Sequence, residues 1–207
     1  MSLEALDLSL LTKSVNWAYK TAVEGPRGLE PASSLAEAHH RPVQTSLQMA
    51  DEIVGWQVAR TSVANFFEDL DAKLAVPEDL PKALTTFLYL QLRISAAIAY
   101  GGGQELHSPL TKALVLSTLL GEQQASALEA ISAPADFVAT RSALKGLAPD
   151  AASTLTDATL PKLLEALQDG GPLAIARTTV SAPWETTDLI QALGATARGT
   201  FIVLHHW

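Results

Sequence analysis

An apolar run interrupted at its centre constrains this chain more than any other feature. The letters "FLYLQLRISAAIAYGGG", residues 87–103, place Gln91 and Arg93 within an otherwise apolar stretch. The apolar run before Arg93 begins only at Ala83, and the run after it stops before Glu105. Neither approaches the roughly 18 consecutive apolar residues of a membrane-spanning helix. We therefore predict a helix buried within protein, no transmembrane span, and a chain that is soluble without detergent. A re-entrant or surface-lying hairpin at a membrane is the alternative.

Helical patterns dominate the rest of the chain. Apolar residues recur at helical spacing in residues 3–23, 46–70 and 80–100, and Gly or Pro follows each of these segments. Strand patterns are weak throughout. The sequence predicts an all-α, single-domain helical bundle spanning residues 1–207. We expect about seven to nine helices, of which 46–70 and 80–100 form two long antiparallel central helices joined by a short connection.

Shorter helices and one loop complete the predicted organisation. A capping-box spacing of Ser34 and Glu37 favours a short helix that ends at Pro42. Further helices are predicted over 108–121, 122–130, 134–145 and 160–168, and from Pro183 towards Leu204. The segment "APDAASTLTD", residues 148–157, is rich in small polar residues and is predicted to be a flexible loop.

Charge and composition narrow the classes of partner. The formal net charge is −8, whereas binding to phosphates requires a basic face. Nucleic acid is therefore not an expected partner, and electrostatic attachment to anionic lipid is disfavoured for the same reason. The chain has no cysteine, so it has neither disulfides nor thiolate metal ligands. Acidic residues near the start do not fit an export signal, which favours a cytoplasmic location, with attachment at the membrane periphery as an alternative.

Three blocks, taken together, resemble the EcsC family of bacterial proteins. They are "GPRGLEPASSLAEAH" at 25–39, "GWQVARTS" at 55–62 and "VPEDLPKALTTFLYLQLRISAAIAYGGG" at 76–103. A weaker match covers "TTDLIQALGATARGTF" at 186–201. The blocks follow the order of the family and cover most of the chain. Two positions depart from the family pattern, because "ANFFEDLDAK" and "VSAPWETT" replace glycine-rich stretches.

The resemblance implies a helical domain without an established catalytic activity. The founding member of the family is encoded with an ATP-driven exporter, which implies a membrane-linked complex for the family. On this basis we expect a non-catalytic domain that binds a protein or a lipid-like partner. No cofactor is expected.

Polar residues within the long apolar helices are the best candidates for a site. A buried polar group left without a hydrogen bond costs about 1–3 kcal/mol, so these residues are expected to meet one another. One interpretation is a structural network that fixes helix packing. The other is a pocket, lined by Gln57, Gln91 and Arg93, for a small polar or anionic ligand. The full candidate set is Glu52, Trp56, Gln57, Arg60, Asp79, Gln91 and Arg93.

Two alternative functions stay open. An acidic immunity-type or inhibitor protein would use its negative charge to cover a basic surface on a target. A hydrolase would be built on Glu37, His39 and His40. Adjacent histidines diverge by about 100° on a helix, so a shared metal ion is disfavoured and no metal site is predicted. No known metal-protease, serine-hydrolase, phosphate-loop or dinucleotide motif occurs in the sequence.

Overall fold

The described residues of the computed structural model form helices and turns. They are residues 6–25, 72–101, 103–131, 147 and 149–169. Within this part of the chain 80% of residues are helical and none lies in a strand, which confirms the all-α class. The elements are α1 (Leu8–Glu24), α5 (Lys82–Gly101), α6 (Pro109–Ser117), the 3-10 turn η2 (Thr118–Gln123), α7 (Gln124–Leu128), the 3-10 turn η3 (Glu129–Ile131) and α9 (Ala151–Asp169).

Both ends of helix α1 are defined by a capping residue, Asp7 at the N-terminus and Gly25 at the C-terminus. The Asp7 carboxylate accepts a hydrogen bond of 2.7 Å from the Leu10 amide, which caps the first turn. Helix α1 therefore starts five residues later than the predicted start at residue 3. Its last residue is Glu24 and its C-cap is Gly25, where an added Cβ would lie 2.5 Å from the Thr21 carbonyl oxygen. The buried face has helical spacing and consists of Leu11, Ser14, Val15, Ala18, Tyr19, Thr21, Ala22 and Val23.

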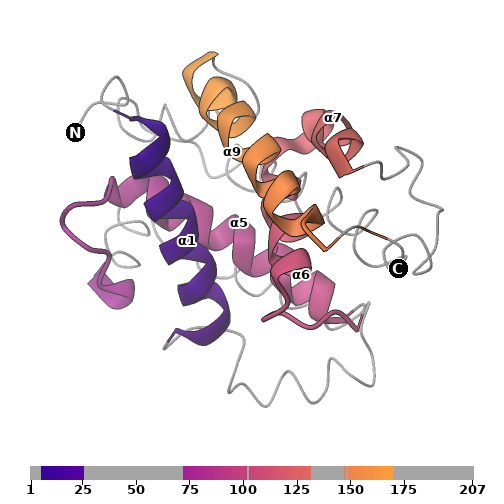
Figure 1. The fold of residues 1–207 in the computed structure, drawn as a ribbon. Helices are drawn as coiled ribbons and strands as arrows, with labels where there is room; N and C mark the ends of the chain where they lie inside the picture. Colours follow the sequence, from indigo (N-terminus) through magenta and orange to yellow (C-terminus); the bar gives the residue numbers. More distant parts are fainter. Residues whose placement is uncertain (1–5, 26–71, 102, 132–146, 148, 170–207) are drawn as a thin grey trace.

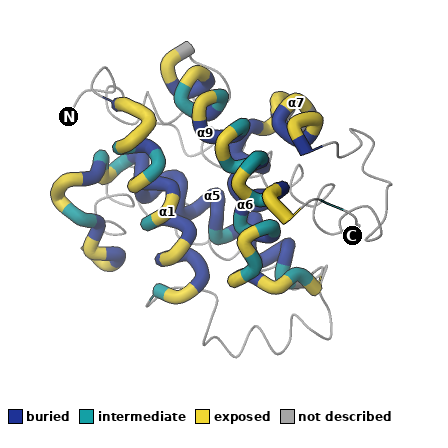
Figure 2. The backbone as a smooth tube through the Cα atoms, in the orientation of Figure 1, coloured by how far each residue is buried: buried dark blue, intermediate teal, exposed yellow. Residues whose placement is uncertain are grey.

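Helix α5 is the buried centre of the described part of the fold. It passes behind α1 and runs towards α6 (Figure 1), and these two helices pack against it. Every side chain from Leu84 to Ala99 is buried except that of Arg93, which is half-buried. Figure 2 shows α5 as the most continuously buried of the helices. An all-round apolar helix is expected to be buried in this way. No helix in the described residues is long and apolar enough to cross a bilayer.

A left-handed glycine follows the end of α5, where the sequence predicted that glycine ends the helix. Gly103 has a φ of 80°, and its amide donates to the Tyr100 carbonyl oxygen at 2.8 Å. The next amide, that of Gln104, reaches back to the Ala99 carbonyl oxygen at 3.0 Å. These bonds satisfy carbonyl groups that the last turn of a helix leaves open.

The predicted helix over 108–121 is divided in two. Helix α6 stops at Ser117, and the chain continues as η2 through Gly121, which has a φ of 55°. The hydroxyls of Ser117 and Thr118 donate to the carbonyl oxygens of Leu114 and Val115, three residues earlier. These side-chain bonds compete with the regular helical pattern.

Helix α9 corrects the prediction of a flexible loop over 148–157. It spans Ala151–Asp169 and packs against α6. Its first turns bury Ala151, Leu155 and Thr159, which are spaced four apart. Hydroxyls in this segment, which suggested a loop, instead bond to backbone carbonyl oxygens. The Ser153 hydroxyl donates to the Asp150 carbonyl oxygen at 2.8 Å, and the Thr156 hydroxyl donates to that of Ala152 at 2.8 Å. Burial of one face outweighed the low helix propensity of these residues.

Candidate functional site

The structure describes three of the predicted site residues. The other four members of the polar set lie outside the described residues, as do the three residues of the hydrolase hypothesis; they are Glu52, Trp56, Gln57, Arg60, Glu37, His39 and His40. The antiparallel pairing of 46–70 with α5 therefore stays a prediction.

The three described residues do not form one cluster. Gln91 is 4% exposed, and Arg93, two positions later, is half-buried. Two positions correspond to about 200° around a helix, so these side chains leave α5 on opposite sides. Asp79 is exposed in the turn before α5. With about 1.5 Å of rise per residue, Arg93 lies about 16 Å along the axis from the start of α5. Asp79 is therefore neither buried nor within reach of Arg93, contrary to the expected pairing.

A cluster of buried polar side chains lies where α5 meets the end of α6. Ser95 on α5 shares a hydrogen bond of 3.0 Å with the Thr118 hydroxyl. The Gln124 amide nitrogen, on α7, donates to the Ser117 hydroxyl at 2.9 Å. All four side chains are at most 6% exposed. We call Ser95, Ser117, Thr118 and Gln124 the hydroxyl cluster.

The chemistry of the hydroxyl cluster fits a structural role. Its bonds join hydroxyls to one another, to a side-chain amide and to the Leu114 and Val115 carbonyl oxygens. Buried polar networks of this kind restrict how helices pack, because a shifted register would leave polar groups without partners. Ser95 lies four residues after Gln91 and therefore on the same stripe of α5. It gave no signal for Ser117, Thr118 or Gln124, whose partners are set by the turn after α6.

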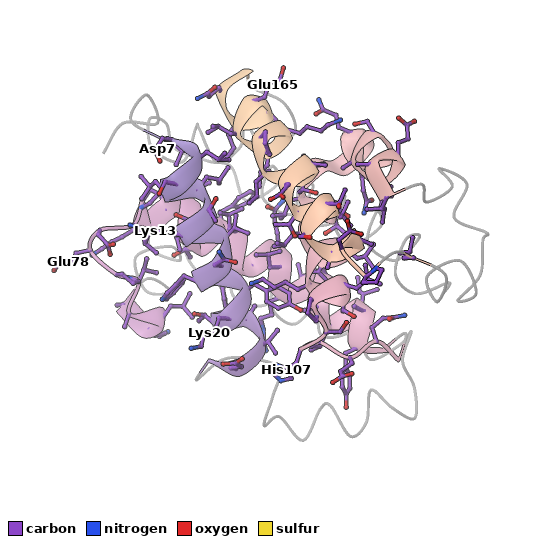
Figure 3. The ribbon with its side chains drawn as sticks, viewed as in Figure 1. Asp7, Lys13, Lys20, Glu78, His107 and Glu165 are labelled. Atoms are coloured by element: carbon purple, nitrogen blue, oxygen red, sulfur yellow. The ribbon has the colours of Figure 1, made fainter. Side chains whose placement is uncertain are left out.

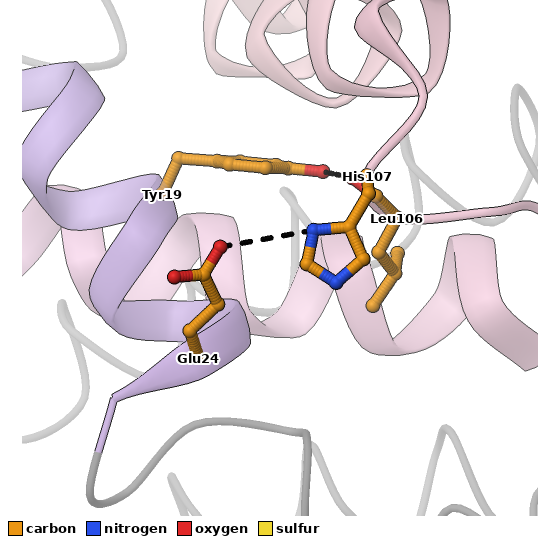
Figure 4. Close-up of polar contacts among 4 residues, drawn as sticks. All are labelled: Tyr19, Glu24, Leu106 and His107. Atoms are coloured by element: carbon orange, nitrogen blue, oxygen red, sulfur yellow. Dashed lines mark hydrogen bonds and ion pairs between the residues drawn. The ribbon is translucent and has the colours of Figure 1, made fainter.

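A second group of contacts joins α1 to the segment 105–112, which precedes and begins α6. The Tyr19 hydroxyl donates to the Leu106 carbonyl oxygen at 2.7 Å (Figure 4). In the same view His107 Nδ1 lies 3.7 Å from a Glu24 carboxylate oxygen, and both of these side chains are about half exposed. Exposed pairs of this kind contribute about 0–1 kcal/mol, so the buried tyrosine bond is the stronger contact.

Lys112 completes the contact with α1. Its Nζ donates to Asn16 Oδ1 at 2.8 Å and lies 5.6 Å from the centre of the Tyr19 ring. Partial burial lowers the pKa of the Lys112 ammonium below its ordinary value, because desolvation disfavours the charged form. The Asn16 oxygen and the aromatic face favour the charged form, but desolvation is the larger influence. The sequence analysis did not single out Tyr19, His107 or Lys112.

Other titratable side chains of the described residues are exposed. Those labelled in Figure 3 are Asp7, Lys13, Lys20, Glu78, His107 and Glu165. The described residues contain no group of three His, Asp or Glu side chains placed to hold a metal ion. Comparison with known proteins found no matching family, no matching curated protein and no matching solved structure.

Proposed function

We propose that the chain is a non-catalytic helical domain that binds a protein partner through a basic surface of that partner. The observation that carries this proposal is the net charge of −8, together with carboxylates that are exposed on the described helices and turns. An excess of exposed charge of one sign accelerates encounter with a surface of the opposite sign. The exposed carboxylates include those of Glu78, Asp79, Glu129, Asp157 and Glu165.

We further propose that the domain is a divergent relative of the EcsC family. The support is the order of the three sequence blocks, the third of which contributes α5. Because α5 is buried, residues shared in that block would maintain a helical core rather than a contact surface. The proposal includes a bundle of about seven to nine helices with 46–70 packed antiparallel to α5. A cytoplasmic domain at a membrane-linked complex is the setting that this relationship implies.

Salt-dependent capture tests the proposal. The full chain, tagged and immobilised, would be exposed to an extract of its own source at about 0.05 M and about 0.5 M salt, which differ severalfold in screening length. We expect one protein to bind stoichiometrically at low salt and to be released at high salt. The variant Asp157→Asn/Glu165→Gln, which removes two exposed carboxylates from α9, should weaken this binding. The matched variant Lys13→Gln/Lys20→Gln on α1 should not weaken it.

Two other outcomes would replace the proposal. Flotation of the purified chain with zwitterionic phosphatidylcholine vesicles, together with capture that is insensitive to salt, would favour the lipid-like partner. Ester or amide hydrolysis that is lost in Glu37→Gln and in His39→Ala/His40→Ala would favour the hydrolase. If the captured protein binds both charge variants as tightly as the wild type, binding does not depend on the exposed carboxylates, and the proposal is contradicted.

A further inference from the structure

We draw no further inference here: the strongest candidate, the N-terminus of α6, where the Ser108 side chain makes no capping hydrogen bond one turn before Lys112, carries nothing because a helix N-terminus is not by itself a binding site and the Lys112 ammonium is already bonded to Asn16.

Discussion

Two buried hydroxyls of α5, those of Thr85 and Ser95, differ in their hydrogen bonding. Ser95, in the second half, is fully buried and shares a hydrogen bond with Thr118. Thr85, in the first turn, is equally buried, but its Oγ1 makes no hydrogen bond within the described part of the chain. The two positions have the same burial and similar chemistry, so only the neighbouring elements distinguish them.

This difference shows that the burial of a hydroxyl and its hydrogen bonding have different structural causes. The apolar composition of α5 buries both hydroxyls, whereas the turn after α6 provides a partner for only one of them. A hydroxyl buried without a partner costs about 1–3 kcal/mol, while a bonded one contributes about 1 kcal/mol. Removing the Thr85 hydroxyl and breaking the Ser95–Thr118 bond are therefore expected to change the free energy of unfolding in opposite directions. Arg93 lies between Thr85 and Ser95 in the sequence, and its substitution is expected to change the stability of the fold most.

The largest effect is expected at Arg93. Arg93→Ala should lower the free energy of unfolding by about 2–4 kcal/mol if it leaves a buried partner without its charge. Urea denaturation followed by circular dichroism would measure this loss. Lys82→Ala, at an exposed position of the same helix, is the control and should cost no more than about 0.5 kcal/mol.

Arg93→Met separates the charge from the apolar stem of the side chain. It should recover part of the loss, because the stem still packs against its neighbours. If the free energy of unfolding of Arg93→Ala is within about 0.5 kcal/mol of the wild-type value, Arg93 has no structural role and the ligand-pocket interpretation gains support.

The next largest effect is expected in the hydroxyl cluster. Thr118→Val removes the bond to Ser95 and should destabilise the fold by about 1–2 kcal/mol. A double-mutant cycle with Ser95→Ala should give a coupling energy of at least about 0.5 kcal/mol. Thr156→Val is the matched control, because the Thr156 hydroxyl bonds only to its own helix in the described contacts. Strict additivity of the two substitutions would show that the Ser95–Thr118 bond does not contribute.

Thr85→Val should stabilise the fold, in contrast to the substitutions above. The substitution keeps the shape of the side chain and removes a buried hydroxyl, so it should raise the free energy of unfolding by about 1 kcal/mol. The same denaturation experiment would measure the gain. A loss of stability would mean that the Thr85 hydroxyl is hydrogen-bonded after all, and the contrast between Thr85 and Ser95 would disappear.

The smallest effect concerns Lys112, a partly buried cation outside α5. Because its folded-state pKa is lowered, the unfolded chain binds more protons at alkaline pH. Stability should therefore rise with pH between the lowered folded-state pKa and the ordinary lysine value. Unfolding measured across this window should show a smaller rise with pH in Lys112→Met than in the wild type. Lys20→Met, at an exposed position of α1, should keep the wild-type dependence on pH.

Local sequence patterns predicted the elements whose signals lie within a few residues. The apolar spacing of 3–23 and 80–100 predicted α1 and α5, and the glycines after Tyr100 predicted the end of α5. The burial of Gln91 also followed from its place in an apolar helix. The first turns of α9 were missed, because their Ser, Thr and Asp residues have the composition of a loop. Their helix depends on contacts with α6, which the local sequence does not encode.

By itself, the sequence determined the all-α class, the buried helix around Gln91 and the carboxylate excess. These properties depend on composition and on spacings of three or four residues, which act within one helix. Tertiary structure alone decided which polar groups meet. The partners Ser95 and Thr118 are 23 residues apart, and Tyr19 and Leu106 are 87 apart. The exposed position of Asp79, away from Arg93, was decided in the same way. Contacts at such separations form only when the helices pack, because periodicity fixes which face is buried but not what that face will meet.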